Sequence, residues 1–93
     1  MVSKEEFKRE VWAIAEEVHA RPKQIRLRAM KSKFGSCSSG KVVTFNSSIL
    51  QYDDAIRKEV IVHELLHIRY KNHGKLFKTM MKEYLRIFHE NSL

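Results

Sequence analysis

One short stretch in the second half of the chain constrains the fold more than any other. Residues 60–68 read VIVHELLHI, and they are apolar except for His63, Glu64 and His67. A helix that is apolar nearly all round is buried, and an unpaired polar group in such a helix costs about 1–3 kcal/mol. The three polar side chains therefore need a partner, and a bound metal ion would satisfy them together. The alternative is that both histidines are ordinary core residues with hydrogen-bond partners.

The spacing of these residues matches the HExxH pattern of zinc-dependent hydrolases. Residues four apart lie about 40° apart around a helix axis, so His63 and His67 project from one face at a separation that one ion can bridge. Glu64 lies about 100° round the axis, where it can reach a metal-bound water without being a ligand. Zinc lowers the pKa of such a water to about 7. The pattern predicts one Zn²⁺ per chain, with Glu64 as the general base that takes the proton and later protonates the leaving amine.

A zinc site of this kind needs a third protein ligand, and His73 is the first candidate. In an unbroken helix His73 would point about 120° away from His67 and lie about 9 Å further along the axis, so the chain must turn first. Asn72 and Gly74 flank His73, and both residues tolerate the left-handed conformation that ends helices. The competitor is Glu83, whose place in an ordinary amphipathic run favours a solvated carboxylate. We therefore expect His73 to complete the metal site.

Local patterns predict an α–β–β–α–α order of elements. Ser3 and Glu6 form a capping box, Pro22 ends the first helix, and Asp53 suits the start of the second. Apolar and β-branched patterns predict two antiparallel strands on either side of a turn-rich loop at 34–40. The predicted helices span 3–19, 53–71 and 76–89, the strands span 25–29 and 41–45, and residues 46–52 read as an irregular turn of helix.

Length and composition set the remaining limits. The 93 residues suit a single domain, 1–93, with a thin core, because chains of this size bury only about 60% of their unfolded surface. The one cysteine, Cys37, excludes an intramolecular disulfide and fits a reducing compartment. No apolar stretch approaches the roughly 20 residues that span a bilayer, and residues 1–10 lack the apolar region of a signal peptide. These features predict a cytoplasmic protein without a membrane partner.

The net charge suggests a second hypothesis. The formal charge is +7, from 18 Lys and Arg against 11 acidic residues, and such a charge can attract nucleic acid. The basic residues are spread along the chain and mixed with Glu, however, without a block of like charges. A nucleic-acid-associated protein, with a structural zinc or with a peptidase that acts on DNA-bound substrates, is therefore the alternative and not the favoured reading.

Several ordered motifs together resemble a known family. They are similar to the core of the YgjP-like metallopeptidases and of the small enzymes called minigluzincins, and the resemblance covers about residues 26–80. The matching segments are 30–38 (MKSKFGSCS), 43–46 (VTFN), 63–67 (HELLH) and 72–77 (NHGKLF).

The resemblance implies a fold and a set of site residues. The fold is α+β, a minimal thermolysin-like (gluzincin-type) catalytic subdomain with a backing helix, a small antiparallel sheet, the HExxH active-site helix and a C-terminal helix. The zinc would be bound by His63, His67 and His73, and Glu64 would be the general base. The implied activity is that of a zinc metalloendopeptidase acting on a peptide or protein substrate.

Two positions differ from related patterns. Phe34 stands where the YgjP-like pattern favours Trp, which we interpret as a change in packing. Tyr70 stands three residues after His67, where metzincins have Gly. The tyrosine argues against the metzincin class and predicts a helix that continues to Lys71.

The C-terminal segment is the expected place of regulation. Some minigluzincins resemble latent zymogens in which this segment covers the metal, and residues 89–93 (HENSL) contain potential ligands. A blocking extended tail, a frayed terminus and a last helix exchanged between two chains are all open at this stage, so the expected state is a monomer or a helix-swapped dimer. An inactive scaffold is a third hypothesis, and the intact Glu64 opposes it.

A few further residues carry weaker expectations. Tyr70, Tyr84 and His89 are candidates for a donor to the developing oxyanion, although no spacing rule selects one of them. Cys37, a lone cysteine in a Ser/Gly loop, is expected to be inert. The strand at 42–45 is expected to offer its edge to an extended substrate peptide.

Overall fold

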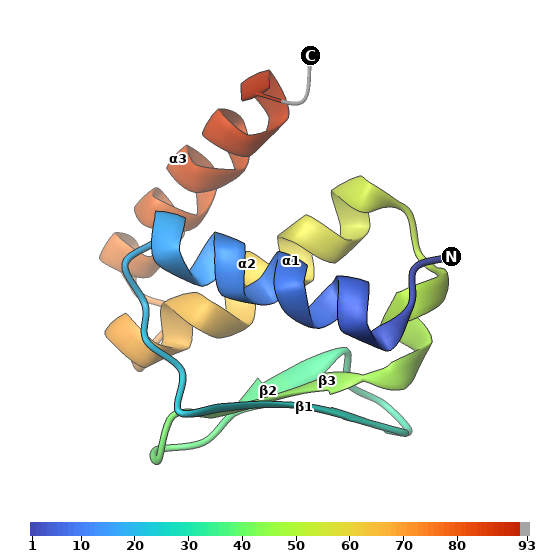
Figure 1. The fold of residues 1–93 in the computed structure, drawn as a ribbon. Helices are drawn as coiled ribbons and strands as arrows, with labels where there is room; N and C mark the ends of the chain where they lie inside the picture. The colour runs from blue at the N-terminus through green and yellow to red at the C-terminus, as the bar shows by residue number, and fades with distance from the viewer. Residues whose placement is uncertain (92–93) are drawn as a thin grey trace.

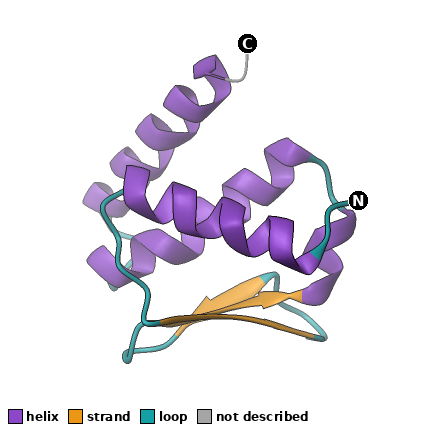
Figure 2. Cartoon of the chain, viewed as in Figure 1, coloured by secondary structure: helices purple, strands orange, loops and turns teal. Residues whose placement is uncertain are grey.

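All three α-helices lie on the same side of a small sheet in the computed structural model, which describes residues 1–91 (Figure 1; Figure 2). The predicted α+β class is confirmed. The elements in chain order are α1 (Lys4–Glu17), β1 (Gln24–Arg28), β2 (Gly35–Cys37), β3 (Val42–Asn46), the 3₁₀-helix η1 (Ser47–Gln51), α2 (Asp54–Arg69) and α3 (Lys75–Asn91).

Helix α1 begins at the predicted capping box. The Ser3 side chain accepts a hydrogen bond from the Glu6 amide, and the Glu6 carboxylate accepts one from the Ser3 amide, so two amides at the helix start are satisfied. The helix ends at Glu17, earlier than the expected His19, because the chain turns sharply there and His19 adopts a φ of 58°. The prediction of the first helix is otherwise confirmed.

The sheet corrects the predicted strand pairing. Its order is β1–β3–β2, with β1 parallel to β3 and only β2 antiparallel to β3. The expectation that the first and last of these strands pair in antiparallel fashion was therefore wrong. The loop expected at 34–40 contains a strand of its own, β2, so the chain reverses direction once more than the sequence pattern suggested.

The strand β2 was missed because its residues are typical of turns. Gly35, Ser36 and Cys37 have little intrinsic strand preference, and they form a strand because the neighbouring β3 offers them a hydrogen-bonding partner in register with Phe45, Thr44 and Val43. Tertiary pairing has overridden local propensity here.

The other elements follow the local signals closely. The Asp53 side chain caps α2 by accepting a hydrogen bond from the Ile56 amide, and the irregular helical turn expected at 46–52 is η1. Helix α2 ends at Arg69, two residues before the predicted Lys71, and α3 continues beyond the predicted His89 to Asn91. No helix within residues 1–91 has the length and apolar character needed to cross a membrane.

The core lies between α1, α2 and the face of the sheet that these helices cover (Figure 1). Each of these elements contributes side chains from one face, and α3 adds Phe77 at its start. A partly buried ion pair links α1 to α2, with Arg57 Nε 3.0 Å from Glu10 Oε1. The largest fully buried side chains are Phe7, Val11, Val18, Val43, Phe45, Ile49, Ile61, Val62, Leu65 and Leu66. This packing places α2 against β2, with Glu64 of α2 next to Gly35 of β2.

Candidate metal centre

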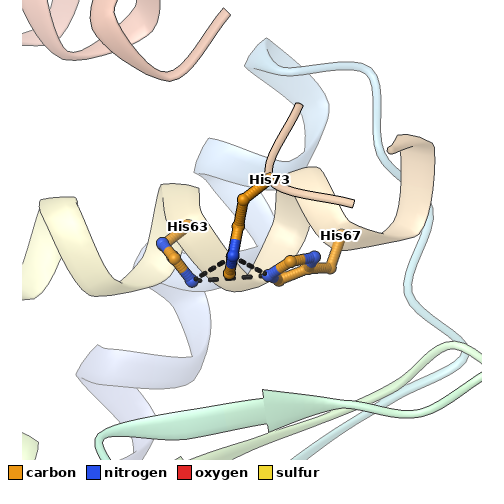
Figure 3. A group of neighbouring side chains, drawn as sticks. All are labelled: His63, His67 and His73. Carbon is orange, nitrogen blue, oxygen red and sulfur yellow. Dashed lines mark hydrogen bonds between the residues drawn. The ribbon is translucent and has the colours of Figure 1, made fainter. Parts of the chain in front are cut away.

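Three histidines converge beside α2. The His63 Nε2 atom lies 3.3 Å from His67 Nε2 and 3.3 Å from His73 Nε2, and the last two nitrogens are 2.9 Å apart. His63 and His67 come from one face of α2, and His73 reaches down from the segment between α2 and α3 (Figure 3). The predicted grouping of the three side chains is present in the structure.

The donor set fits a metal ion. Two nitrogens bound to one tetrahedral zinc at 2.0–2.1 Å lie about 3.3 Å from each other, and two of the three observed separations equal 3.3 Å. Within the described part of the chain, these residues are the group of potential ligands whose donor atoms all lie within 4.8 Å of one another. Three imidazoles leave a fourth tetrahedral position open, which is the arrangement of catalytic zinc sites.

His73 reaches the site through an extended residue and not through the expected left-handed ones. Tyr70 caps α2 with φ −133° and ψ 110°, and its amide donates to the Leu66 carbonyl at 2.7 Å. Neither Asn72 nor Gly74 has a positive φ, so that part of the prediction was wrong. The turn itself lies where the geometry of His73 required it.

The competing ligand, Glu83, lies elsewhere. Its carboxylate forms an ion pair with Arg86 one turn further along α3, and both side chains are about half exposed. The hydrogen bond and charge of Arg86 hold the pKa of Glu83 below its usual value. Glu83 is absent from the group of potential metal ligands found among residues 1–91.

Glu64 lies buried beside the histidines, with 7% of its surface exposed. Its Oε2 atom is 4.0 Å from His63 Nε2. Burial raises the pKa of Glu64 to about 7, and the nearby charge of Lys33 acts in the opposite direction. The carboxylate thus lies next to the convergent nitrogens without being one of the grouped donors.

The surroundings of His63 and His67 favour the protonation state that metal binding needs. Burial, followed by the charges of His67 and His73, lowers the pKa of His63. Burial and the charge of His73 also lower the pKa of His67, whereas hydrogen bonds with the backbone of Tyr70 and Lys71 oppose that shift. Both shifts favour the neutral imidazole that metals require, and the backbone bonds of His67 orient its ring.

Phe77, at the start of α3, packs against the site. Its ring centre lies 5.3 Å from that of His63 and 4.8 Å from those of His67 and His73. Only 4% of Phe77 is exposed. No sequence signal showed that Phe77 packs against all three imidazoles.

A cleft runs between β2 and α2 on both sides of Glu64. One cavity of about 590 Å³ lies toward the end of β2 and is lined by Ser36, Cys37, Lys41, His67 and Lys71, among others. A second, of about 430 Å³, lies toward the start of β2 and is lined by Phe34, Ile56, Glu59 and Val60, among others. Both cavities include Lys33, Gly35, His63 and Glu64.

The free edge beside this cleft belongs to β2, not to the strand at 42–45. That strand, β3, is the central strand of the sheet, so the expectation that it presents an edge to a peptide was wrong. The backbone amide of Asn46 donates to the Phe34 carbonyl, and the backbone amide of Ser38 donates to the Val42 carbonyl. Because ladder bonds alternate along an antiparallel pair, the backbone groups of Gly35 and Cys37 point away from β3 toward the open edge.

None of the three candidates for an oxyanion donor lines either cavity of the cleft. The Tyr70 ring lies against the Arg69 guanidinium, and Tyr84 stacks on Phe88 of α3. His89 lines a cavity at the opposite end of α2, beside Asp54. For Cys37, burial and then the charge of Glu64 raise the pKa of the thiol, which supports the expectation of an inert cysteine.

The chain was compared with families, curated proteins and solved structures. The family described as "YgjP-like, metallopeptidase domain" matches residues 2–91, whereas no curated protein matches the chain. The metallopeptidase zymogen jannalysin of Methanocaldococcus jannaschii has a similar structure, with a TM-score of 0.74 and 28% identity over 84% of this chain and 80% of that one. The metallopeptidase zymogen abylysin of Pyrococcus abyssi gives a TM-score of 0.72 and 15% identity over 82% of this chain and 76% of that one.

These comparisons agree with the geometry of the site. The fold shared with the two zymogens is the expected gluzincin-like one, and a metallopeptidase family implies a metal, for which the three convergent histidines are candidate ligands. The family match extends over nearly all the residues that the structure describes. The chain therefore belongs to the YgjP-like metallopeptidase family.

Proposed function

We propose that the chain is a zinc metalloendopeptidase, in which His63, His67 and His73 bind one zinc ion and Glu64 is the general base. The observation that carries the proposal is the triangle of Nε2 atoms, with edges of 2.9–3.3 Å, next to a buried carboxylate at the centre of a cleft. When bound at such a site, zinc polarises a substrate carbonyl and acidifies a water.

Residues of the chain would carry out proton transfer and substrate binding. Glu64, 4.0 Å from His63 Nε2, takes a proton from the attacking water and delivers it to the amine that leaves. The free backbone groups of Gly35 and Cys37 offer hydrogen bonds to an extended peptide, which would add a strand to the edge of β2. This pairing would place the peptide across Glu64, because Gly35 and Glu64 line both cavities of the cleft.

The relation of the C-terminal segment to the cleft bears on latency. Both cavities are lined by residues within 33–71, and residues 75–91 form a helix that packs on α2 of the same chain. No residue of 75–91 lines either cavity, although Phe77 contacts the three imidazoles. Ser92 and Leu93, which belong to the expected covering tail, lie outside the described residues. Latency, a helix-swapped dimer and a cytoplasmic location stay predictions.

The first experiment measures metal and activity together. We expect the purified chain to hold about one zinc per molecule by mass spectrometry, and His73→Ala to lose most of it. His89→Ala is the matched control, since His89 lies at the other end of α2. If His73→Ala retained all of its zinc, the third ligand would be another residue. A chain that never takes up zinc would contradict the proposal.

Glu64→Gln tests the base separately from the metal. The amide keeps the shape of the carboxylate but cannot accept the proton, so we expect zinc to be retained while cleavage of an unfolded protein falls by about 10²-fold or more. Zinc retention shows that the site is intact in this variant. Cleavage at the full rate by Glu64→Gln would show that Glu64 is not the general base, and the proposed metal site would still stand.

A further inference from the structure

The two cavities of the cleft differ in charge. Lys41 and Lys71 line only the cavity at the end of β2, and Glu64 is the only acidic residue among those that line it. The cavity at the start of β2 has Glu59 in place of these lysines, together with the apolar side chains of Phe34 and Val60. Lys33 borders both cavities. Lys33 and Glu64 are thus shared by both ends of the cleft, while Lys41 and Lys71 belong to one end and Glu59, with the apolar side chains, to the other.

The position of Lys41 is set by an unusual backbone. Its φ is 65°, a conformation that residues with a side chain seldom adopt. Hydrogen bonds fix it there, because its amide donates to the Ser38 carbonyl at 3.0 Å and its carbonyl accepts from the Lys23 amide at 2.8 Å. Many sequences would have glycine at such a site. Here a lysine occupies it and lines the cleft.

A peptide paired with β2 would lie along this change in charge. Antiparallel pairing is the slightly more stable mode per residue, and in that mode the peptide runs from the Cys37 end of β2 toward the Gly35 end. Residues before the scissile bond would then lie beside Lys41 and Lys71, and residues after it would lie beside Phe34 and Val60.

Resting on the proposed peptidase function, we propose that Lys41 and Lys71 form a basic subsite that selects substrates with acidic side chains before the scissile bond. Apolar side chains are accepted after it, where Glu59 repels acidic ones. The basic cavity has no aromatic residue other than histidine among those that line it. It therefore lacks the aromatic side chains on which the bases of single-stranded nucleic acid stack. An acidic peptide fits the charge and lining of this cavity better than a nucleic acid does.

Cleavage of a peptide mixture by the full zinc-loaded chain tests the preference. Mass spectrometry of the products should show Asp and Glu enriched before the cut bond and depleted after it. A matched pair of peptides, one with glutamates and one with glutamines before that bond, should then differ about fivefold in kcat/KM, as expected for exposed charge pairs. Added salt should reduce the difference.

Charge reversal assigns the preference to the two lysines. In Lys41→Glu/Lys71→Glu the glutamate peptide should lose its advantage over the glutamine peptide, while Lys8→Glu, on the exposed face of α1, should keep it. All three lysines are exposed, so the variants are expected to fold, and circular dichroism checks this. Equal cleavage of both peptides by the unmodified chain would overturn the inference and leave the peptidase function standing. An acidic preference only after the bond would also overturn it.

Measurements of peptide binding can test the basic subsite independently of the peptidase function. The Glu64→Gln variant should bind the glutamate peptide about fivefold more tightly than the glutamine peptide, and this preference should vanish when Lys41 and Lys71 are reversed as well. If no peptide is cleaved at all, the peptidase proposal fails, and this binding measurement still decides for or against the subsite. A single-stranded oligonucleotide that binds through the same two lysines, with no preference between the peptides, would overturn the inference in favour of nucleic acid.

Discussion

Gly35 shows how little space separates β2 from the buried carboxylate of α2. A Cβ atom at this position would lie 2.9 Å from the Thr44 carbonyl oxygen and 3.0 Å from Glu64 Cγ. Because the first neighbour is backbone, we expect Gly35→Ala to shift β2 or Glu64, to cost about 1–3 kcal/mol of stability, and to reduce activity. Gly40→Ala is the control, since its Cβ would meet nothing nearer than 3.8 Å. Urea unfolding and kcat measure both effects, and equal stability of the two variants would contradict the argument.

The capping box of α1 predicts a pH effect at the scale of one element. Hydrogen bonds from Ser3 lower the pKa of Glu6 below its ordinary 4.5. A lowered pKa stabilises the fold above pH 4.5, and this contribution is lost as the pH falls through the lower folded value. In Glu6→Gln the amide can still close the box, so we expect normal folding at neutral pH but a smaller loss of stability on acidification. Unfolding in urea between pH 3 and 6 tests this, with Glu5→Gln as the control, which should behave like the unmodified chain.

At the scale of the whole molecule, the ion pair of Arg57 joins the two halves of the chain. Its guanidinium donates to both oxygens of Glu10 at 3.0 and 3.3 Å, and to the Tyr52 carbonyl at 2.8 Å, while only 9% of Arg57 is exposed. Glu10→Ala leaves a buried cation short of its partner, so we expect a loss of about 2–3 kcal/mol. At about 4–8 °C per kcal/mol for a domain of this size, Tm should fall by more than 8 °C. Glu16→Ala, at an exposed position of the same helix, should change Tm little, and a similar Tm for both variants would contradict this role.

Much of the site could be predicted from the sequence, because the signals were local. His63 and His67 share a helix face through their spacing, and the capped starts of α1 and α2 depend on residues within one turn. The need for a turn before His73 followed from the same helical geometry, although the residue that makes it, Tyr70, was not foreseen.

By itself, the sequence determined the three α-helices among residues 1–91 and the histidine pair on one face of α2, since helical periodicity and capping act over a few residues. Only the tertiary structure decided that residues 35–37 form a strand, that β1 and β3 run parallel, and that β2 and not β3 provides the free edge. It alone also placed Phe77 against three imidazoles and two lysines at one end of the cleft. These features depend on pairing and packing between residues far apart in the chain, for which turn-like and exposed residues carry no periodic signal.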